Sequence, residues 1–289
     1  MSVNKFLSFL SNGVWCAGCG KGGDLLKWQR SGAAYVVGVD IAATSIEQCK
    51  DRYHEMRGRN RDRIFDAEFY AADCTKQRTR ELYRDRNIQF DLVSCQFAFH
   101  YSFESLHQAE CMMRNIAENL KVGGFFIGTT PYSHDIMARL AASRTNSFGN
   151  SVYSVTFPSE RLGEQPALFG AQYTFHLTEV VDCPEFLVHF PTLVKLAERF
   201  GLTMVAKQRF QNYFHERKEK AEHSKLLGRM NALESYPARR REAGGPDQYD
   251  AARHFIRERP GVQGGVGTLS KDEWEALTIY TVFAFKKMA

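Results

Sequence analysis

The chain has 289 residues, of which 44% are apolar and 25% charged, enough to build one large domain or a core with a sizeable insertion. Its formal net charge of +5 is compatible with an anionic partner but is shared by many ordinary enzymes. No apolar run reaches the roughly 18 to 20 residues of a membrane span, so we expect no membrane partner. The seven cysteines are odd in number and mostly lie in apolar runs, so we expect reduced thiols and neither a disulfide framework nor a metal site.

A glycine-rich turn follows the first apolar run of the chain, residues 14–17. The glycines at 18, 20 and 23 fit the pattern G-x-G-x-x-G, and Asp40 lies twenty residues past Gly20, after a second apolar run. Glycines let the backbone approach a nucleotide-like ligand, and a carboxylate at this spacing binds ribose hydroxyls. The pattern predicts a Rossmann-like site for an adenosine cofactor, but it leaves open which one.

The first half of the chain alternates predicted strands and helices. We expect strands at 14–17, 35–39, 67–71, 90–95 and 125–129, separated by helices at 24–31, 41–57 and 106–120. In an open parallel sheet, ligands bind outside the carboxyl ends of the strands. The residues to watch there are Gly18, Asp40, Asp73 and the polar and aromatic group at 96–101.

Beyond residue 136 the alternation breaks. Residues 151–157 and 173–177 alternate like antiparallel strands, 191–200 is a predicted helix, and 202–210 and 277–287 are predicted strands that return to the main sheet. This order is expected of an α/β fold with a seven-stranded Rossmann-like sheet. The division that we predict is an atypical segment at 1–13, a cofactor-binding core at 14–135, an insertion at 136–200, late core strands at 201–212 and 277–289, and a lobe at 213–276.

Five stretches together resemble one family, the eukaryotic mRNA cap guanine-N7 methyltransferases, and in particular its animal members. The resemblance extends from about residue 14 to the end of the chain. Its motifs are Gly18–Trp28, Cys95–Phe97 with His100–Ser105, Gly128–Pro131, Pro184–Val188, and Gly267–Ser270 with Glu273–Glu275.

The resemblance implies a class I methyltransferase fold that binds S-adenosylmethionine and holds a cap guanine above the methyl group. The cofactor residues that it implies are Gly18, Gly20, Asp24, Asp40, Asp73, Cys74, Gln96 and Tyr101. Those that it implies for the cap are Lys21, Arg52, Phe97, His100, Tyr101, Pro131, Glu185 and Tyr280. Because guanine N7 already carries a lone pair and the sulfonium is an activated donor, we expect no catalytic acid or base, and the rate to come from alignment. Metal is not implied.

The partners that the resemblance implies are the capped 5′ end of RNA, a small activating subunit on the lobe at about 213–260, and the RNA polymerase II capping machinery. It also implies a nuclear location.

The sequence departs from the family at its start. Cys16 stands where the family has an acidic residue, and residues 1–13 are too short for the family's N-terminal arm, so we expect that 1–17 are not the native start of an active enzyme. One alternative is a catalytically impaired paralogue that still binds caps or RNA. Another is an NAD-dependent oxidoreductase, which would share the glycine turn but would not predict residues 96–101 or Glu185.

Overall fold

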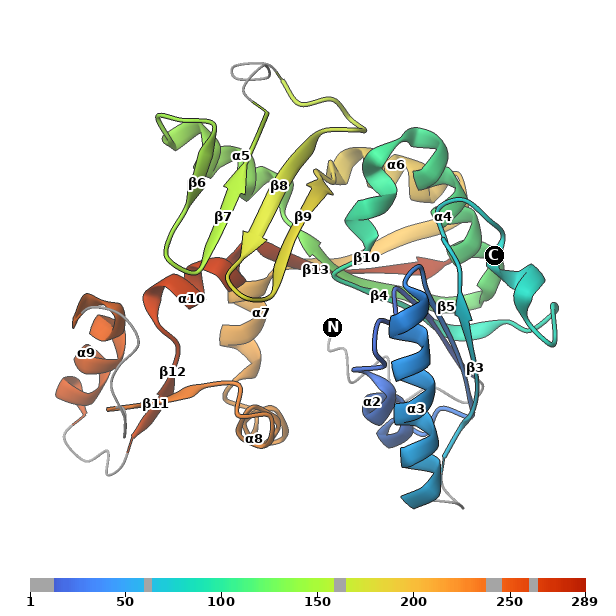
Figure 1. The fold of residues 1–289 in the computed structure, drawn as a ribbon, viewed down its shortest axis with the longest axis horizontal. Helices are drawn as coiled ribbons and strands as arrows, with labels where there is room; N and C mark the ends of the chain where they lie inside the picture. Colours follow the sequence, from blue (N-terminus) through green and yellow to red (C-terminus); the bar gives the residue numbers. More distant parts are fainter. Residues whose placement is uncertain (1–12, 60–63, 159–164, 238–245, 260–264) are drawn as a thin grey trace.

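The computed structural model describes residues 13–59, 64–158, 165–237, 246–259 and 265–289. Its centre is a seven-stranded sheet in the order β10-β13-β5-β4-β1-β2-β3 (Figure 1). The strands from β5 to β3 are parallel neighbours, whereas β13 runs antiparallel to both β5 and β10. The predicted seven-stranded α/β sheet is therefore confirmed.

The main sheet and its helices account for most of the first 131 residues and for two late strands. The strands of the main sheet are β1 Gly13–Ala17, β2 Tyr35–Asp40, β3 Asp66–Ala71, β4 Phe90–Gln96, β5 Leu120–Pro131, β10 Leu202–Arg209 and β13 Tyr280–Lys287. The helices beside it are α2 Leu25–Arg30, α3 Ala43–Arg59, α4 Leu106–Asn119 and α6 Phe190–Glu198, with short 3-10 helices at Thr79–Leu82 and Phe99–Glu104.

Alternation along the strands gives the sheet two buried faces. Val14 and Val36 point to the face that α2 and α3 cover, where they meet Leu25 and Tyr53. Their neighbours Trp15 and Val37 point to the opposite face, which is covered by α4 and α6. Both faces being buried explains why these strands read as continuous apolar runs rather than as alternating ones. The helix α6, which the sequence division grouped with the insertion, packs with the main sheet.

A smaller antiparallel sheet lies between β5 and α6 in the chain and stands beside the main sheet (Figure 1). It contains β6 Ser147–Gly149, β7 Tyr153–Thr156, β8 Gln172–Leu177 and β9 Val181–Phe186, and α5 Ser133–Ala142 packs on it. The two segments expected to alternate like antiparallel strands, 151–157 and 173–177, contain β7 and β8, which pair antiparallel with Tyr153 opposite Leu177.

The lobe follows β10 and returns to the sheet through α10. It contains α7 Phe210–Arg217, α8 Ala221–Arg229, β11 Glu234–Tyr236, a 3-10 helix Pro246–Tyr249, α9 Asp250–Glu258, β12 Val266–Thr268 and α10 Lys271–Thr278. The last strand begins at Tyr280 rather than 277, because a capping box at Ser270 and Glu273 starts a helix that continues to Thr278. None of the helices among the described residues has the length and apolar character to cross a membrane.

Candidate active site

The expected ligand edge is assembled by the strand order. β1, β2, β3, β4 and β5 are parallel, so their carboxyl ends lie along one edge of the sheet. β13 runs the other way, and its first residue, Tyr280, pairs with Pro131 at the end of β5. Residues from six strands, over 260 positions apart in sequence, therefore meet at this edge.

The glycine turn after β1 is held against β2 by its own backbone. Gly18 and Cys19 both donate from their amides to the carbonyl of Val39, at 2.8 and 3.1 Å. Gly18 has a φ of 68°, and a Cβ added there would lie 2.6 Å from the Cβ of Ala98, so a side chain is excluded. Gly20 also has a positive φ, of 50°, but a Cβ at that position would meet nothing within 4 Å. The turn therefore packs against the protein at Gly18 and leaves free space in front of Gly20, where a ligand can approach the backbone.

Asp40 at the end of β2 ties this turn to the start of α3. Its Oδ2 accepts a hydrogen bond from the Gly20 amide at 2.8 Å, and its Oδ1 accepts one from the Ala42 amide at 2.9 Å. The G-x-G-x-x-G spacing therefore does place the Asp40 carboxylate at the glycine turn, the position that a ribose-binding acid would need.

Two more candidate cofactor residues follow the next strands of the sheet. Asp73 lies after β3, where its Oδ1 accepts from the amide and hydroxyl of Thr75 at 2.9 and 2.6 Å. Its neighbour Cys74 is half-buried, and burial raises the pKa of its thiol well above the usual range. Gln96 ends β4, and its Oε1 accepts from the hydroxyl of Thr129 on β5 at 2.7 Å. Side chains that are already oriented by such contacts need little rearrangement to meet a ligand.

Phe97 occupies an unusual backbone position directly after Gln96. Its φ is 56°, in the left-handed region that a bulky residue rarely adopts, and its residue surface is 51% exposed. Its ring contacts that of Tyr280 edge to face, with 5.0 Å between centroids. Strained residues of this kind cluster at ligand sites. Tyr280 is half-buried against the core of the smaller sheet, whereas about half of the Phe97 surface is open to solvent, where a flat ligand can stack on its ring.

Beside this pair lies a buried group of polar side chains. His100 is 1% exposed and Glu185 is 4% exposed, and the Nε2 of the histidine lies 3.3 Å from Oε1 of the glutamate. The contact is not aligned as a hydrogen bond, and within the described part of the chain both ring nitrogens of His100 lack a hydrogen-bond partner. Leaving a buried polar atom unpaired costs about 1 to 3 kcal/mol, so a ligand that satisfied the ring would recover that cost.

Tyr173 holds the other oxygen of Glu185. The two residues face each other across the β8–β9 pair, and the tyrosine hydroxyl donates to Oε2 at 2.7 Å. Burial, and next the charge of Glu185, raise the pKa of Tyr173 well above its ordinary value, so its hydroxyl stays a donor. The sequence analysis did not single out Tyr173. The alternation at 173–177 places Tyr173 on the inward face of β8. Its contact with Glu185, however, follows only once the register between β8 and β9 is known.

Tyr101 completes this side of the site. Its ring lies 4.3 Å from that of His100, measured between centroids, and its hydroxyl lies 3.4 Å from Sγ of Cys183 on β9. Burial and the contact with Cys183 raise the pKa of its phenol. Cys183 is a second neighbour that the sequence analysis missed.

The remaining candidates lie on and around the glycine turn. Lys21 is exposed in the turn, and Arg52 of α3 reaches toward the turn, with its Nη1 3.4 Å from the carbonyl oxygen of Gly22. Asp24 precedes α2 and forms an ion pair with Lys27 at 2.6 Å. The structure thus brings Phe97, His100, Glu185 and Tyr280 into one group and leaves the basic candidates at the surface of the turn.

Cys16 lies in the middle of the main sheet. It is a β1 residue between β2 and β4, and burial is the first of the effects that raise the pKa of its thiol well above the usual range. Its protonated thiol offers the glycine turn no negative charge. Residues 1–12 lie outside the described residues. Among the described residues no group of His, Cys, Asp and Glu could hold a metal ion.

Comparison with known proteins shows the family of this chain. A family model described as the mRNA (guanine-N(7))-methyltransferase domain matches residues 10–288. Similar curated proteins are the mRNA cap guanine-N(7) methyltransferase of Drosophila melanogaster, 49% identical, and that of Caenorhabditis elegans, 39% identical. The chain belongs to the mRNA cap guanine-N7 methyltransferase family. Each alignment covers 93% of this chain, but only 62% of the Drosophila protein and 71% of the nematode one.

Solved structures support the fold. A S-adenosylmethionine-dependent methyltransferase from Clostridium acetobutylicum matches all of the chain and 93% of its own, with a TM-score of 0.51 at 10% identity. A second one, from Listeria monocytogenes, covers 99% of this chain and 95% of its own, also with a TM-score of 0.51, at 13% identity. The fold is that of the S-adenosylmethionine-dependent methyltransferases, and S-adenosylmethionine is the cofactor of this family.

Proposed function

We propose that this chain transfers a methyl group from S-adenosylmethionine to N7 of the guanine that caps the 5′ end of RNA. The observation that supports it best is the polar group of His100 and Glu185, buried beside the exposed Phe97 and its ring partner Tyr280 at the carboxyl edge of the sheet. A guanine stacked on an aromatic ring can present its polar edge to buried hydrogen-bonding groups, and a buried carboxylate that has one donor in Tyr173 is stabilised by the further donors of such an edge.

The glycine turn and the strand ends fit the cofactor. The open space in front of Gly20 can admit a ligand to the backbone, and Asp40, Asp73 and Gln96 offer polar groups along one edge. Asp40 would hold the ribose, Asp73 and Cys74 would flank the adenine, and Gly18, Gly20, Asp24, Gln96 and Tyr101 would line the rest. When bound, S-adenosylmethionine supplies the electrophilic methyl group.

The protein's own residues would supply alignment rather than proton transfer. Guanine N7 donates its lone pair to the methyl carbon, and the leaving sulfur keeps the electron pair of the broken bond, so no proton moves at either atom. Holding the reactants in line can be worth roughly 7 to 11 kcal/mol of barrier. Phe97, Tyr101, Pro131 and Tyr280 would hold the ring, while Lys21 and Arg52 would neutralise the cap phosphates.

Glu185 would select guanine. Its carboxylate can accept from N1–H and from the 2-amino group, two donors that adenine does not present together on that edge, and His100 can meet the neighbouring part of the base. Since Tyr173 orients the carboxylate before any ligand arrives, this recognition is largely prepared in the free protein.

An assay with GpppA-capped RNA and methyl-labelled S-adenosylmethionine tests the proposal. Labelled 7-methylguanosine in a nuclease digest is the expected result. Cap binding without labelled product would instead favour the catalytically impaired cap-binding paralogue, an alternative suggested by Cys16 at a position where the family has an acidic residue. A protein that bound neither the capped RNA nor the methyl donor would contradict both.

We also propose the finer associations that the family resemblance implied: a small activating subunit on the lobe, the RNA polymerase II capping machinery, and a nuclear location. The lobe has a cavity of about 840 Å³, and a second of about 570 Å³ shares several of its lining residues, including Phe214, Leu233 and Phe255. An apolar hollow of this size within the lobe supports docking of a short protein segment. Phe255→Glu should abolish activation by a purified activating subunit without changing basal activity; equal activation of both proteins would place that subunit elsewhere.

A further inference from the structure

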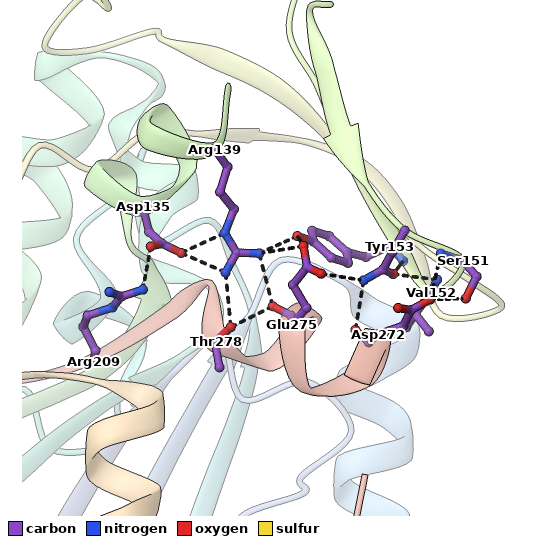
Figure 2. A network of polar contacts seen from close by, with 10 residues as sticks. Asp135, Arg139, Ser151, Val152, Tyr153, Arg209, Asp272, Glu275 and Thr278 are labelled. Carbon is purple, nitrogen blue, oxygen red and sulfur yellow. Dashed lines mark hydrogen bonds and ion pairs between the residues drawn. The ribbon is translucent and has the colours of Figure 1, made fainter. Parts of the chain in front are cut away.

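Arg139 of α5 joins three segments of the chain through one guanidinium group (Figure 2). Its Nε donates to Oδ2 of Asp135 at 3.0 Å within α5. Its Nη1 donates to the hydroxyl of Tyr153 on β7 at 2.6 Å and to Oε1 of Glu275 on α10 at 3.3 Å. Its Nη2 donates to the hydroxyl of Thr278 on α10 at 3.2 Å. Arginine's rigid fork of donors suits such a junction.

Further contacts extend the junction on both sides. Asp135 also accepts from Nη2 of Arg209 on β10 at 2.5 Å, which connects it to the main sheet. Tyr153 donates from its hydroxyl to Oε1 of Glu275 at 3.0 Å, and burial, as the largest cause, raises its pKa to about 12. Ser151 donates to Oδ2 of Asp272 at 2.6 Å near the start of α10. One side of α10 is therefore attached along its length to the insertion.

The end of this helix leads directly into the candidate cap site. Tyr280 follows Thr278 by two residues, and between them the carbonyl of Ile279 accepts from the amide of Tyr132 at 2.7 Å. Tyr280 then pairs with Pro131 and places its ring against Phe97. A shift of α10 along or around its axis would therefore move the Tyr280 ring.

The other side of α10 faces the lobe. Ser270, Lys271 and Trp274 line the 840 Å³ cavity, and the Trp274 ring contacts that of Phe214, with 5.2 Å between centroids. The same short helix thus borders an open cavity on one side and the Arg139 junction on the other. Burial of Ala276 and Ile279 in the core of the smaller sheet also holds α10. The junction adds fixed polar contacts on the side of the helix that faces away from the cavity.

We propose that Arg139 is a positioning residue for cap binding, which it supports by fixing α10 so that Tyr280 stands against Phe97. The inference rests on the proposed function, because it assigns the cap as the ligand that the positioned ring receives. Arg139 touches neither ligand in this assignment. Its loss weakens cap binding and leaves undisturbed the glycine turn after β1 and the ends of β2 and β3, where most of the proposed cofactor contacts lie.

The test compares Arg139→Gln with Arg144→Gln, a matched control at an exposed arginine just beyond α5. We expect KM for GpppA-capped RNA to rise about tenfold in Arg139→Gln, the size of effect usual for a residue in a coupled network, with kcat and the Kd for S-adenosylmethionine unchanged. Arg144→Gln should match the parent protein. Arg139→Lys, which keeps the charge but not the fork, should recover only part of the loss.

A second variant and a structural readout keep the test decisive. Glu275→Gln removes one partner from a half-exposed position and should raise KM in the same direction, and adding it to Arg139→Gln should cost less than the sum of the two single changes. With 3-fluorotyrosine at position 280, the ¹⁹F resonance should shift or broaden in Arg139→Gln and not in Arg144→Gln.

The outcomes separate this inference from the proposed function. If the parent protein makes no 7-methylguanosine but the ¹⁹F signal responds as described, the cap assignment fails and the positioning of Tyr280 stands. If the parent is active and Arg139→Gln leaves both KM and the ¹⁹F signal unchanged, the inference is wrong. It is equally wrong if Arg139→Gln weakens cofactor and cap binding alike, since that would be general loss of structure.

Discussion

The two halves of the candidate site are built in opposite ways. On the cofactor side, the Gly18 amide donates to the carbonyl of Val39 and the Gly20 amide donates to the carboxylate of Asp40, both close to the strand ends. On the cap side, His100 comes from the 3-10 helix after β4 and Glu185 from β9 of the smaller sheet, and the buried ring nitrogens of His100 are left without a hydrogen-bond partner among the described residues. The polar groups of the first half are paired within the protein. The second half leaves the buried ring nitrogens of His100 unpaired within the described ranges, a free-energy cost that a bound ligand can remove. Substitutions on the cap side should therefore change ligand binding much more than stability.

Glu185→Gln should produce the largest loss of activity on capped RNA, and it tests most directly whether the cap half and the cofactor half of the site act separately. Removing one partner of a buried, hydrogen-bonded charged group costs about 2 kcal/mol or more, so kcat/KM for capped RNA should fall roughly thirtyfold or more. The Kd for S-adenosylmethionine, measured by calorimetry, should stay the same. Asp182→Asn, on the same strand but exposed, is the control and should have no effect on either. Equal losses of cap and cofactor binding in Glu185→Gln would make the residue structural and erase the contrast between the two halves.

Phe97→Gly should follow, and it separates ligand binding from stability at one position. Glycine accepts the φ of 56° without the strain of about 1 to 3 kcal/mol that a side chain pays, and little buried surface is lost because Phe97 is half exposed. We expect KM for capped RNA to rise about tenfold, since stacking is worth roughly 1 to 3 kcal/mol per base. The free energy of unfolding, measured in urea, should not fall. A clear loss of stability would mean that Phe97 is a packing residue.

The sequence predicted the contact between the glycine turn and Asp40 because the signals for it are local. The spacing from Gly20 to Asp40 spans one strand, one helix and one turn, so a linear pattern is sufficient to predict the contact between them. The cap half depends on register between distant segments. That Glu185 would meet His100 was implied by family resemblance, and Tyr173 was missed because its partner is decided by how β8 pairs with β9. Arg139 was missed for the same reason: its partners on β7 and α10 lie 14 to 139 positions away.

Asp40→Asn tests the cofactor half and should have a smaller effect. The amide keeps the size of the side chain but loses the charge that two backbone amides contact, and hydrogen bonds to charged groups are worth about 1.5 to 3 kcal/mol. We expect the Kd for S-adenosylmethionine to rise about tenfold, with cap affinity, measured by fluorescence anisotropy of a labelled cap analogue, unchanged. Asp51→Asn, exposed on α3, is the control. A change in cap affinity as large as that in cofactor affinity would show that the two halves are not independent.

The smallest expected effect concerns Glu68, on the edge strand β3 away from the cap. Burial raises the pKa of its carboxyl, but hydrogen bonds from Tyr70 and Arg84 outweigh burial and hold the pKa below its ordinary value of 4.5. A carboxyl whose pKa is lower in the folded than in the unfolded state stabilises the protein at pH values above its unfolded-state pKa. This contribution is lost as the pH falls through the folded-state pKa. Because Arg84 is largely exposed, we expect Glu68→Gln to cost only about 1 kcal/mol at pH 7.

The difference in unfolding free energy between the parent and Glu68→Gln should therefore shrink as the pH is lowered below about 4.5, in urea titrations at each pH. Cap and cofactor affinities should not change, because Glu68 contacts neither half of the site. A difference that stays constant from pH 7 to pH 3 would mean that the carboxylate charge contributes nothing and that the loss comes from packing. A loss of cofactor binding would instead show that the β3 edge supports Asp73, so that the stable half of the site extends farther than its backbone turn.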